Sequence, residues 1–170
     1  MRVVVCTPEE LAALDAAMPS QHHEGRYRVQ LAGQGLYLVA RLDGHAVGHI
    51  LLRWQSTNDT LRLWGISEPY VEALGVIPAL RSRGVGTALM QSVEEAVRQQ
   101  GYSHIGLAVG LENTRARALY ERLGYRDAER PPFEVSWSYV DESGQTRREG
   151  EMCVYLTKPL TRPERSTSEP

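Results

Sequence analysis

Residues 73 to 100 constrain the fold most, because they join an apolar strand to a long amphipathic helix through the loop "PALRSRGVG". Apolar residues recur in the helix at about one turn's spacing, which predicts one buried stripe on a helix from Gly84 to Gln100. The residues of this stripe are Val85, Leu89, Val93 and Val97. The preceding strand is expected at residues 70 to 77, so the loop connects the two elements within a few residues.

The rest of the chain also alternates between strand and helix patterns. Strands are expected at residues 2–6, 36–42, 46–54, 105–109, 133–140 and 151–160, helices at 8–18, 20–32 and 114–123, and a loop at 55–69. The clearest local signals are the helix start Thr7-Pro8-Glu9-Glu10 and the hairpin turn Asp43-Gly44. This order predicts an α/β fold with one mixed sheet in a single domain, residues 1 to 160. A polar tail is expected at residues 161 to 170.

Composition argues against several classes of protein. The 170 residues are 42% apolar and 24% charged, with a net charge of −2, which is typical of a globular domain. Acidic residues are interleaved with the arginines, so we expect no nucleic-acid partner. No run approaches about 18 apolar residues, and the start "MRVVVCTPEE" lacks the features of a signal peptide. We therefore expect no membrane association and a cytoplasmic protein.

Two cysteines, Cys6 and Cys153, lie in predicted strands near opposite ends of the chain. They are either buried thiols in a reducing compartment or a bridge between the terminal strands. No set of histidine, cysteine and acidic residues has the spacing of metal ligands, so no metal is predicted.

The loop that precedes the long helix is suited to bind an anion. The first turn of a helix carries N–H groups without internal partners and the positive end of the helix dipole. Gly84 and Gly86 remove the side chains that would block an anion. Thr87 would add a hydroxyl donor, and Arg81 and Arg83 would add positive charge. The pattern predicts a phosphate or pyrophosphate site; the alternative is a loop that needs glycine only for its backbone angles.

Two common phosphate-binding motifs are excluded by the sequence. A P-loop requires Gly-Lys-Ser or Gly-Lys-Thr, which is absent. A dinucleotide fingerprint requires a third glycine where Leu89 stands and an acid about 20 residues later. No acid lies between Ala96 and Leu111, so the Rossmann interpretation fails.

Two segments resemble the motifs of one family, the GNAT superfamily of acyl-CoA-dependent N-acetyltransferases. "LGVIPALRSRGVGTALM" is similar to its cofactor motif, an apolar strand and a proline followed by Gln/Arg-x-x-Gly-x-Gly/Ala. "ENTRARALYERLGY" resembles its Asn-x-x-Ala-x-x-Leu-Tyr-x-x-Leu-Gly-Phe/Tyr segment, and "VYLTKPL" resembles its last strand. The matching residues are Arg81, Gly84, Gly86, Asn113, Ala116, Leu119, Tyr120, Leu123, Gly124 and Tyr125. The resemblance implies a mixed six- to seven-stranded sheet flanked by about four helices.

The resemblance also implies that acetyl-CoA is a co-substrate. Its pyrophosphate would rest on the backbone N–H groups of Arg81, Ser82, Arg83, Gly84, Val85, Gly86 and Thr87. Its pantetheine arm would pair with the backbone of Leu74, Gly75 and Val76, where the fourth and fifth strands splay apart. A glycine inside a strand suggests a bulge or a close backbone approach, or else a small residue in a crowded core. Asn113 is expected to cap its helix or to hydrogen-bond the cofactor arm.

Two catalytic residues follow from the same resemblance. Tyr120 would protonate the departing thiolate, since an unperturbed tyrosine stays protonated at neutral pH; otherwise it is a core aromatic. Glu72 would accept the proton of the amine. Strand alternation puts Glu72 on the same face as Leu74 and Val76, so its carboxylate points to the acceptor if that face lines the cleft; otherwise it is a solvated charge at a strand end. Weaker candidates for the base are Glu68, His49 and the pair His22-His23.

The acceptor would be a small-molecule or peptide amine. The walls of its pocket are expected at residues 19–35, at residues 55–69 with Trp64, and at a closing hairpin with Phe133, Trp137 and Tyr139. These aromatic residues either line the pocket or pack in the core or at a homodimer contact. Two other functions stay open: a non-catalytic acyl-CoA-binding sensor, which would have no use for Tyr120, and a nucleotide-phosphate binding module.

Overall fold

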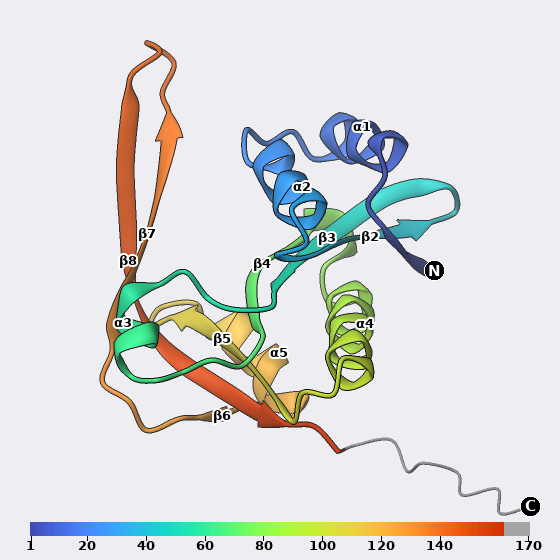
Figure 1. The fold of residues 1–170 in the computed structure, drawn as a ribbon. Helices are drawn as coiled ribbons and strands as arrows, with labels where there is room; N and C mark the ends of the chain where they lie inside the picture. The colour runs from blue at the N-terminus through green and yellow to red at the C-terminus, as the bar shows by residue number, and fades with distance from the viewer. Residues whose placement is uncertain (162–170) are drawn as a thin grey trace, which may run out of the picture.

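The computed structural model describes residues 1 to 161, so the expected polar tail lies outside the described part except for Thr161. This part contains eight strands and five α-helices, which form a mixed α/β structure as predicted (Figure 1). In chain order the elements are β1 (Arg2–Val5), α1 (Pro8–Ala17), α2 (His23–Leu31), β2 (Gly35–Leu42), β3 (His45–Arg53), α3 (Asp59–Leu63), β4 (Tyr70–Val76), a 3-10 turn (Pro78–Leu80), α4 (Val85–Gln99), β5 (His104–Gly110), α5 (Thr114–Arg122), β6 (Arg126–Asp127), β7 (Phe133–Val140) and β8 (Thr146–Pro159).

The strands form one sheet in the order β1-β2-β3-β4-β5-β8-β6, and β7 pairs with the first half of β8. All neighbouring pairs are antiparallel except β4 and β5, which are parallel. Helices α1 and α2 pack on one face of the sheet, and α4 and α5 pack on the other (Figure 1). The predicted stripe of α4 is fully part of the larger core. The hairpin of β7 and β8 projects beyond the rest of the sheet (Figure 1).

Strands β4 and β5 pair only where β4 begins. The register joins Tyr70 to Gly106 and Val71 to Leu107, and the described strands share no further pairs. Beyond Val71, β4 keeps its partner β3 on one side and has an open edge on the other, at residues 74–76. The expected splay between the fourth and fifth strands is therefore confirmed. It leaves an open backbone edge just before the loop that leads into α4.

The shortest elements were not predicted from the sequence. The predicted loop at residues 55–69 contains α3, because the Asn58 side chain accepts the N–H of Leu61 at 3.2 Å and the Leu61 side chain is buried. A five-residue helix is shorter than two turns, so it leaves no periodic pattern. Strand β6 has two residues and β8 begins five residues earlier than predicted. The described sheet thus has eight strands instead of six or seven, and five helices instead of about four.

The two cysteines are not bridged. Cys6 and Cys153 are free and lie in different hydrophobic clusters, so the alternative of a disulfide is wrong. Burial raises the pKa of each thiol to about 11.

Residues 1–161 include no helix long and apolar enough to cross a membrane. Nor does this part of the chain bring three histidine, cysteine or acidic side chains together where they could hold a metal ion.

Candidate active site

A cavity of about 680 Å³ lies between the open edge of β4, the start of α4 and one face of α5. The predicted cofactor residues that line it are Leu74, Gly75, Val76, Arg81, Ser82, Gly84, Gly86, Thr87 and Asn113. Three other predicted residues do not line it: Arg83 is exposed, and Val85 and Tyr120 are buried. Two segments about thirty residues apart in the sequence thus meet around one cavity, and what they bind stays a prediction.

The N-terminus of α4 is open to this cavity. Gly84 is the N-cap residue, with φ of 83°, and no side chain caps the helix. Within residues 1–161 the N–H groups of Ser82, Arg83 and Gly84 donate to no backbone carbonyl. First-turn amides have no intrahelical acceptor either, so a set of free donors lies at the positive end of the helix dipole. The positive φ shows that Gly84 is needed for its backbone angle, and the anion site stays a prediction.

Two other glycines allow close packing. A Cβ at Gly86 would lie 3.2 Å from Leu119 Cδ2, so glycine there lets α5 approach α4. A Cβ at Gly75 would clash with the ring of His49, which supports the crowded-core explanation, although Gly75 also lines the cavity. Burial and the charge of Arg26 lower the pKa of His49 to about 3, so its ring is neutral at physiological pH.

Three arginines, Arg81, Arg115 and Arg122, line the cavity. Arg81 Nε donates to the Val76 carbonyl at 3.3 Å, and Arg115 Nη2 donates to Ser82 Oγ at 3.0 Å. Arg115 and Arg122 line the cavity from α5 and were missed in the sequence. Their seven-residue separation puts them on one face of a helix, and this spacing was the signal that could have found them.

Tyr120 is buried in α5, with 7% of its surface exposed. Its ring packs edge-on against Tyr125 with ring centroids 6.0 Å apart, so the ring does belong to the core. Burial raises the pKa of the Tyr120 hydroxyl to about 12, so this group is protonated at neutral pH.

Asn113 caps α5 as expected, because its Oδ1 accepts the N–H of Ala116 at 3.2 Å, and its side chain also lines the cavity.

Glu72 does not share a face with Leu74. The pairing of β3 with β4 shifts between Leu51 and Leu52, which leaves Glu72 without a Cα partner and interrupts the alternation of the strand. The Glu72 carboxylate forms an ion pair with Arg53 and lines a second cavity. Leu74 instead packs against the core that contains α4 and lines the first cavity. The predicted shared face is wrong, because a bulge resets the alternation.

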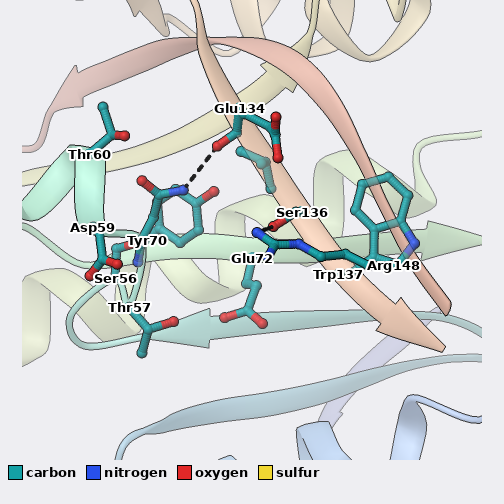
Figure 2. Close-up of a pocket in the computed structure, with 12 residues that line it drawn as sticks. Ser56, Thr57, Asp59, Thr60, Tyr70, Glu72, Glu134, Ser136, Trp137 and Arg148 are labelled. Carbon is teal, nitrogen blue, oxygen red and sulfur yellow. Dashed lines mark hydrogen bonds between the residues drawn. The ribbon is translucent and has the colours of Figure 1, made fainter. Parts of the chain in front are cut away.

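The second cavity has a volume of about 480 Å³ and lies where β4 meets the β7–β8 hairpin (Figure 2). Its lining residues are Ser56, Thr57, Asn58, Asp59, Thr60, Tyr70, Glu72, Glu134, Val135, Ser136, Trp137 and Arg148. Asn58 Nδ2 donates to the Glu134 carbonyl at 3.3 Å, and Arg148 Nη2 donates to Ser136 Oγ at 2.7 Å. The first half of β4 lines this cavity and the second half lines the other, so both cavities border β4.

Of the four aromatic residues expected at the acceptor walls, Trp137 lines the second cavity. Phe133 is buried and packs edge-on against Trp64, with ring centroids 5.3 Å apart. The Tyr139 hydroxyl donates to Glu149 at 3.1 Å. The core explanation is therefore correct for Phe133 and Trp64.

The segment at residues 19–35 reaches the hairpin through Gln21. The Gln21 side-chain nitrogen donates to the Val140 carbonyl at 3.1 Å, and its side-chain oxygen accepts the Val140 N–H at 2.7 Å. These two hydrogen bonds hold the end of β7 against the connection between α1 and α2.

Two of the weaker base candidates, Glu68 and His23, have structural partners. Glu68 Oε1 accepts hydrogen bonds from Tyr155 at 2.7 Å and from Thr157 at 2.8 Å. His22 is the N-cap residue of α2. His23 is buried, and its two ring nitrogens bond a tyrosine hydroxyl and a backbone carbonyl, both at 2.7 Å. None of these side chains lines either cavity.

Residues 8 to 125 match the model of the acetyltransferase (GNAT) family, so the chain belongs to that family. An uncharacterised N-acetyltransferase of Methanocaldococcus jannaschii is 32% identical over 95 residues, which cover 55% of this chain and 40% of that protein. The chain spans between 20% and 64% of the length of four curated relatives that it matches.

Solved structures share the fold at low sequence identity. The ribosomal-protein-S18-alanine N-acetyltransferase of Escherichia coli has a TM-score of 0.64 and 18% identity, with 97% of both chains covered. An aminoglycoside 6′-N-acetyltransferase complexed with coenzyme A has a TM-score of 0.63 and 16% identity, with 96% of this chain and 100% of that chain covered. At these identities the likeness concerns the fold.

Proposed function

We propose that the chain is an N-acetyltransferase that moves the acetyl group of acetyl-CoA to a primary amine. The observation that carries the proposal is the uncapped N-terminus of α4, which opens into the cavity beside the unpaired edge of β4. A diphosphate suits such a terminus, because free N–H donors and the helix dipole stabilise its charge. The extended arm of the coenzyme would then pair with residues 74–76. Family membership and the coenzyme A bound in the related aminoglycoside acetyltransferase support the same co-substrate.

The transfer would occur by direct attack in a ternary complex. The neutral amine nitrogen attacks the thioester carbonyl carbon, a C–N bond forms, the C–S bond breaks and the sulfur leaves as a thiolate. Tyr120 donates its proton as negative charge develops on the sulfur, since its pKa keeps the hydroxyl protonated until then. The proton that the amine released returns to Tyr120 through solvent, so the reaction yields an amide and free coenzyme A.

Glu72 is the proposed base. It lines the second cavity and lies two residues before Leu74, so an amine bound there would be close to both the Glu72 carboxylate and a thioester at the edge of β4. Arg53 holds this carboxylate in place through their ion pair. The base would act directly or through one water molecule.

Thiol release from acetyl-CoA, measured with a library of primary amines, tests the proposal. We expect release above the hydrolysis background with at least one class of amine, and calorimetry should show tighter binding of acetyl-CoA than of ATP or NAD. Binding of acetyl-CoA without turnover on any amine would indicate a non-catalytic sensor. Tighter binding of ATP or NAD would indicate a nucleotide-binding module.

A further inference from the structure

We propose that the amine acceptor also carries a carboxylate, as a free α-amino acid does, and that Arg148 binds this carboxylate. The inference rests on the proposed transferase function and names the substrate class of the second cavity. Glu72 and Arg148 border the same cavity of about 480 Å³, so a carboxylate and a guanidinium surround one space. That volume is within the range of small-molecule sites, roughly 300 to 1,000 Å³.

Arg148 is a cation without an acidic partner in the part of the chain that the structure describes. Its Nη2 donates to Ser136 Oγ at 2.7 Å, whereas Arg53 and Arg147 each form an ion pair with an acid. A guanidinium presents five N–H donors in a planar fork that matches a carboxylate. Most of the Arg148 fork is therefore available to a ligand.

The Arg148 side chain lies along the hairpin, where it borders this cavity and a smaller one of about 330 Å³ that Glu134, Glu149 and Glu151 also line. In the register of β7 with β8, Arg148 lies opposite Ser138, but its guanidinium bonds Ser136, two residues closer to the start of β7. Figure 2 shows this side chain reaching Ser136 at the hairpin, with the Glu72 carboxylate lower in the view, beyond the β4 ribbon. Opposite charges at separate points of one cavity are complementary to a zwitterion. The ammonium would lie toward Glu72 and the carboxylate toward Arg148.

Two further acids line the cavity and define the main alternative. Asp59 and Glu134 would favour an acceptor with several positive charges, such as a polyamine. However, the Asp59 side chain is 92% exposed and lies 3.7 Å from Arg62, so its field is screened by solvent and by that cation. Glu134 is also exposed, and it lies on the hairpin and not on β4. Glu72 and Arg148 are exposed residues as well, but the Glu72 side chain is only 38% exposed and is fixed by Arg53, so the zwitterion is the better match for this pair.

The test compares α-amino acids with their α-carboxamides and with the corresponding amines that lack the carboxyl group. For the wild-type protein we expect kcat/KM at least about tenfold higher for the acids, because a charge-assisted bidentate pair contributes this much or more. Arg148→Gln should remove the preference by raising KM for the acids, while the carboxamides and the KM of acetyl-CoA change little. Arg148→Lys should restore part of it, since the charge returns without the planar fork.

Arg147→Gln is the matched control. Arg147 is the neighbouring residue in β8, and its substitution removes the same positive charge. It forms an ion pair with Asp141 and does not line the cavity. Amino-acid binding to the protein loaded with free coenzyme A, measured by calorimetry, gives a second readout that needs no turnover. Here too, Arg148→Gln should weaken binding about tenfold and Arg147→Gln should not.

The outcomes separate this inference from the proposed function. Acetylation of carboxamides, polyamines or C-terminally blocked peptides as efficiently as of amino acids would overturn the inference and leave the transferase in place. A preference for acids that survives in Arg148→Gln would also overturn it. Absence of acetylation with every amine would overturn the proposed function, and the inference would fall with it.

Discussion

The two cavities that border β4 are built in different ways. The cavity at α4 is lined by residues between 74 and 122, and it presents backbone groups at the uncapped helix start and the open strand edge, with arginine side chains beside them. The second cavity combines residues 56–60, the start of β4, residues 134–137 and Arg148, and most of its lining side chains are polar or charged. Backbone groups are the same in every sequence, whereas side chains differ. We therefore expect the first cavity to determine the co-substrate and the second to determine the acceptor.

The support beneath the two cavities differs as well. Helix α4 rests on fully buried residues, among them Leu89 and Val93. The β7–β8 hairpin exposes 40% of Trp137 and 51% of Val140, and Gln21 bonds the end of β7. Because local stability follows burial, the first cavity should be rigid and the second should depend on a few tertiary contacts. Four substitutions test this comparison, from the largest expected effect to the smallest.

Tyr120→Phe should lower kcat by about 100-fold, because it removes the proton donor for the thiolate. The affinity for acetyl-CoA should be unchanged, since phenylalanine keeps the ring that packs against Tyr125. Steady-state kinetics and calorimetry measure the two effects separately. Unchanged turnover would exclude Tyr120 as the donor, and a parallel loss of affinity would mean that the ring supports the first cavity.

Glu72→Gln should lower kcat/KM by about tenfold or more at neutral pH, where the acceptor is an ammonium and needs a base. Above about pH 10 an alkyl amine is largely neutral, so the loss should shrink there. Arg53→Gln breaks the same ion pair but keeps the carboxylate, and it should cost less. Equal losses in both variants at every pH would assign Glu72 a structural role.

Gly84→Ala should weaken acetyl-CoA binding by about tenfold, because the new methyl group would project into the space beside the free N–H donors. Gly101→Ala is the control, since both glycines have positive φ, 83° and 85°, and no atom lies within 4 Å of either added Cβ. Each change should lower the free energy of unfolding by about 1 kcal/mol. Equal affinity in the two variants would show that Gly84 serves only the backbone angle.

Gln21→Ala should raise the KM of the acceptor by about threefold, because two hydrogen bonds to the end of β7 are lost. The KM of acetyl-CoA should not change, since Gln21 does not line the first cavity. Gln99→Ala, on the exposed face of α4, serves as the control. A change in both KM values would show that the two cavities are coupled through the sheet.

Much of the first cavity could be predicted because its determinants are local. The stripe of α4, the glycines before it and the Asn113 cap all act within a few residues of sequence. The strand face predicted for Glu72 was wrong, because the bulge that changes it arises from how β3 pairs with β4. Arg115 and Arg122 were missed for another reason: they became cavity residues only when α5 packed beside α4.

By itself the sequence determined the kind of elements, their order and the free amides before α4, because periodicity, capping and turn chemistry are short-range properties of the chain. Only the tertiary structure decided the ion pair of Glu72 with Arg53 and the hydrogen bond of Arg148 with Ser136. Each of these depends on strand register and on packing between segments distant in the sequence. Many contacts between distant segments stabilise these features together, so no short stretch of sequence is enough to predict them.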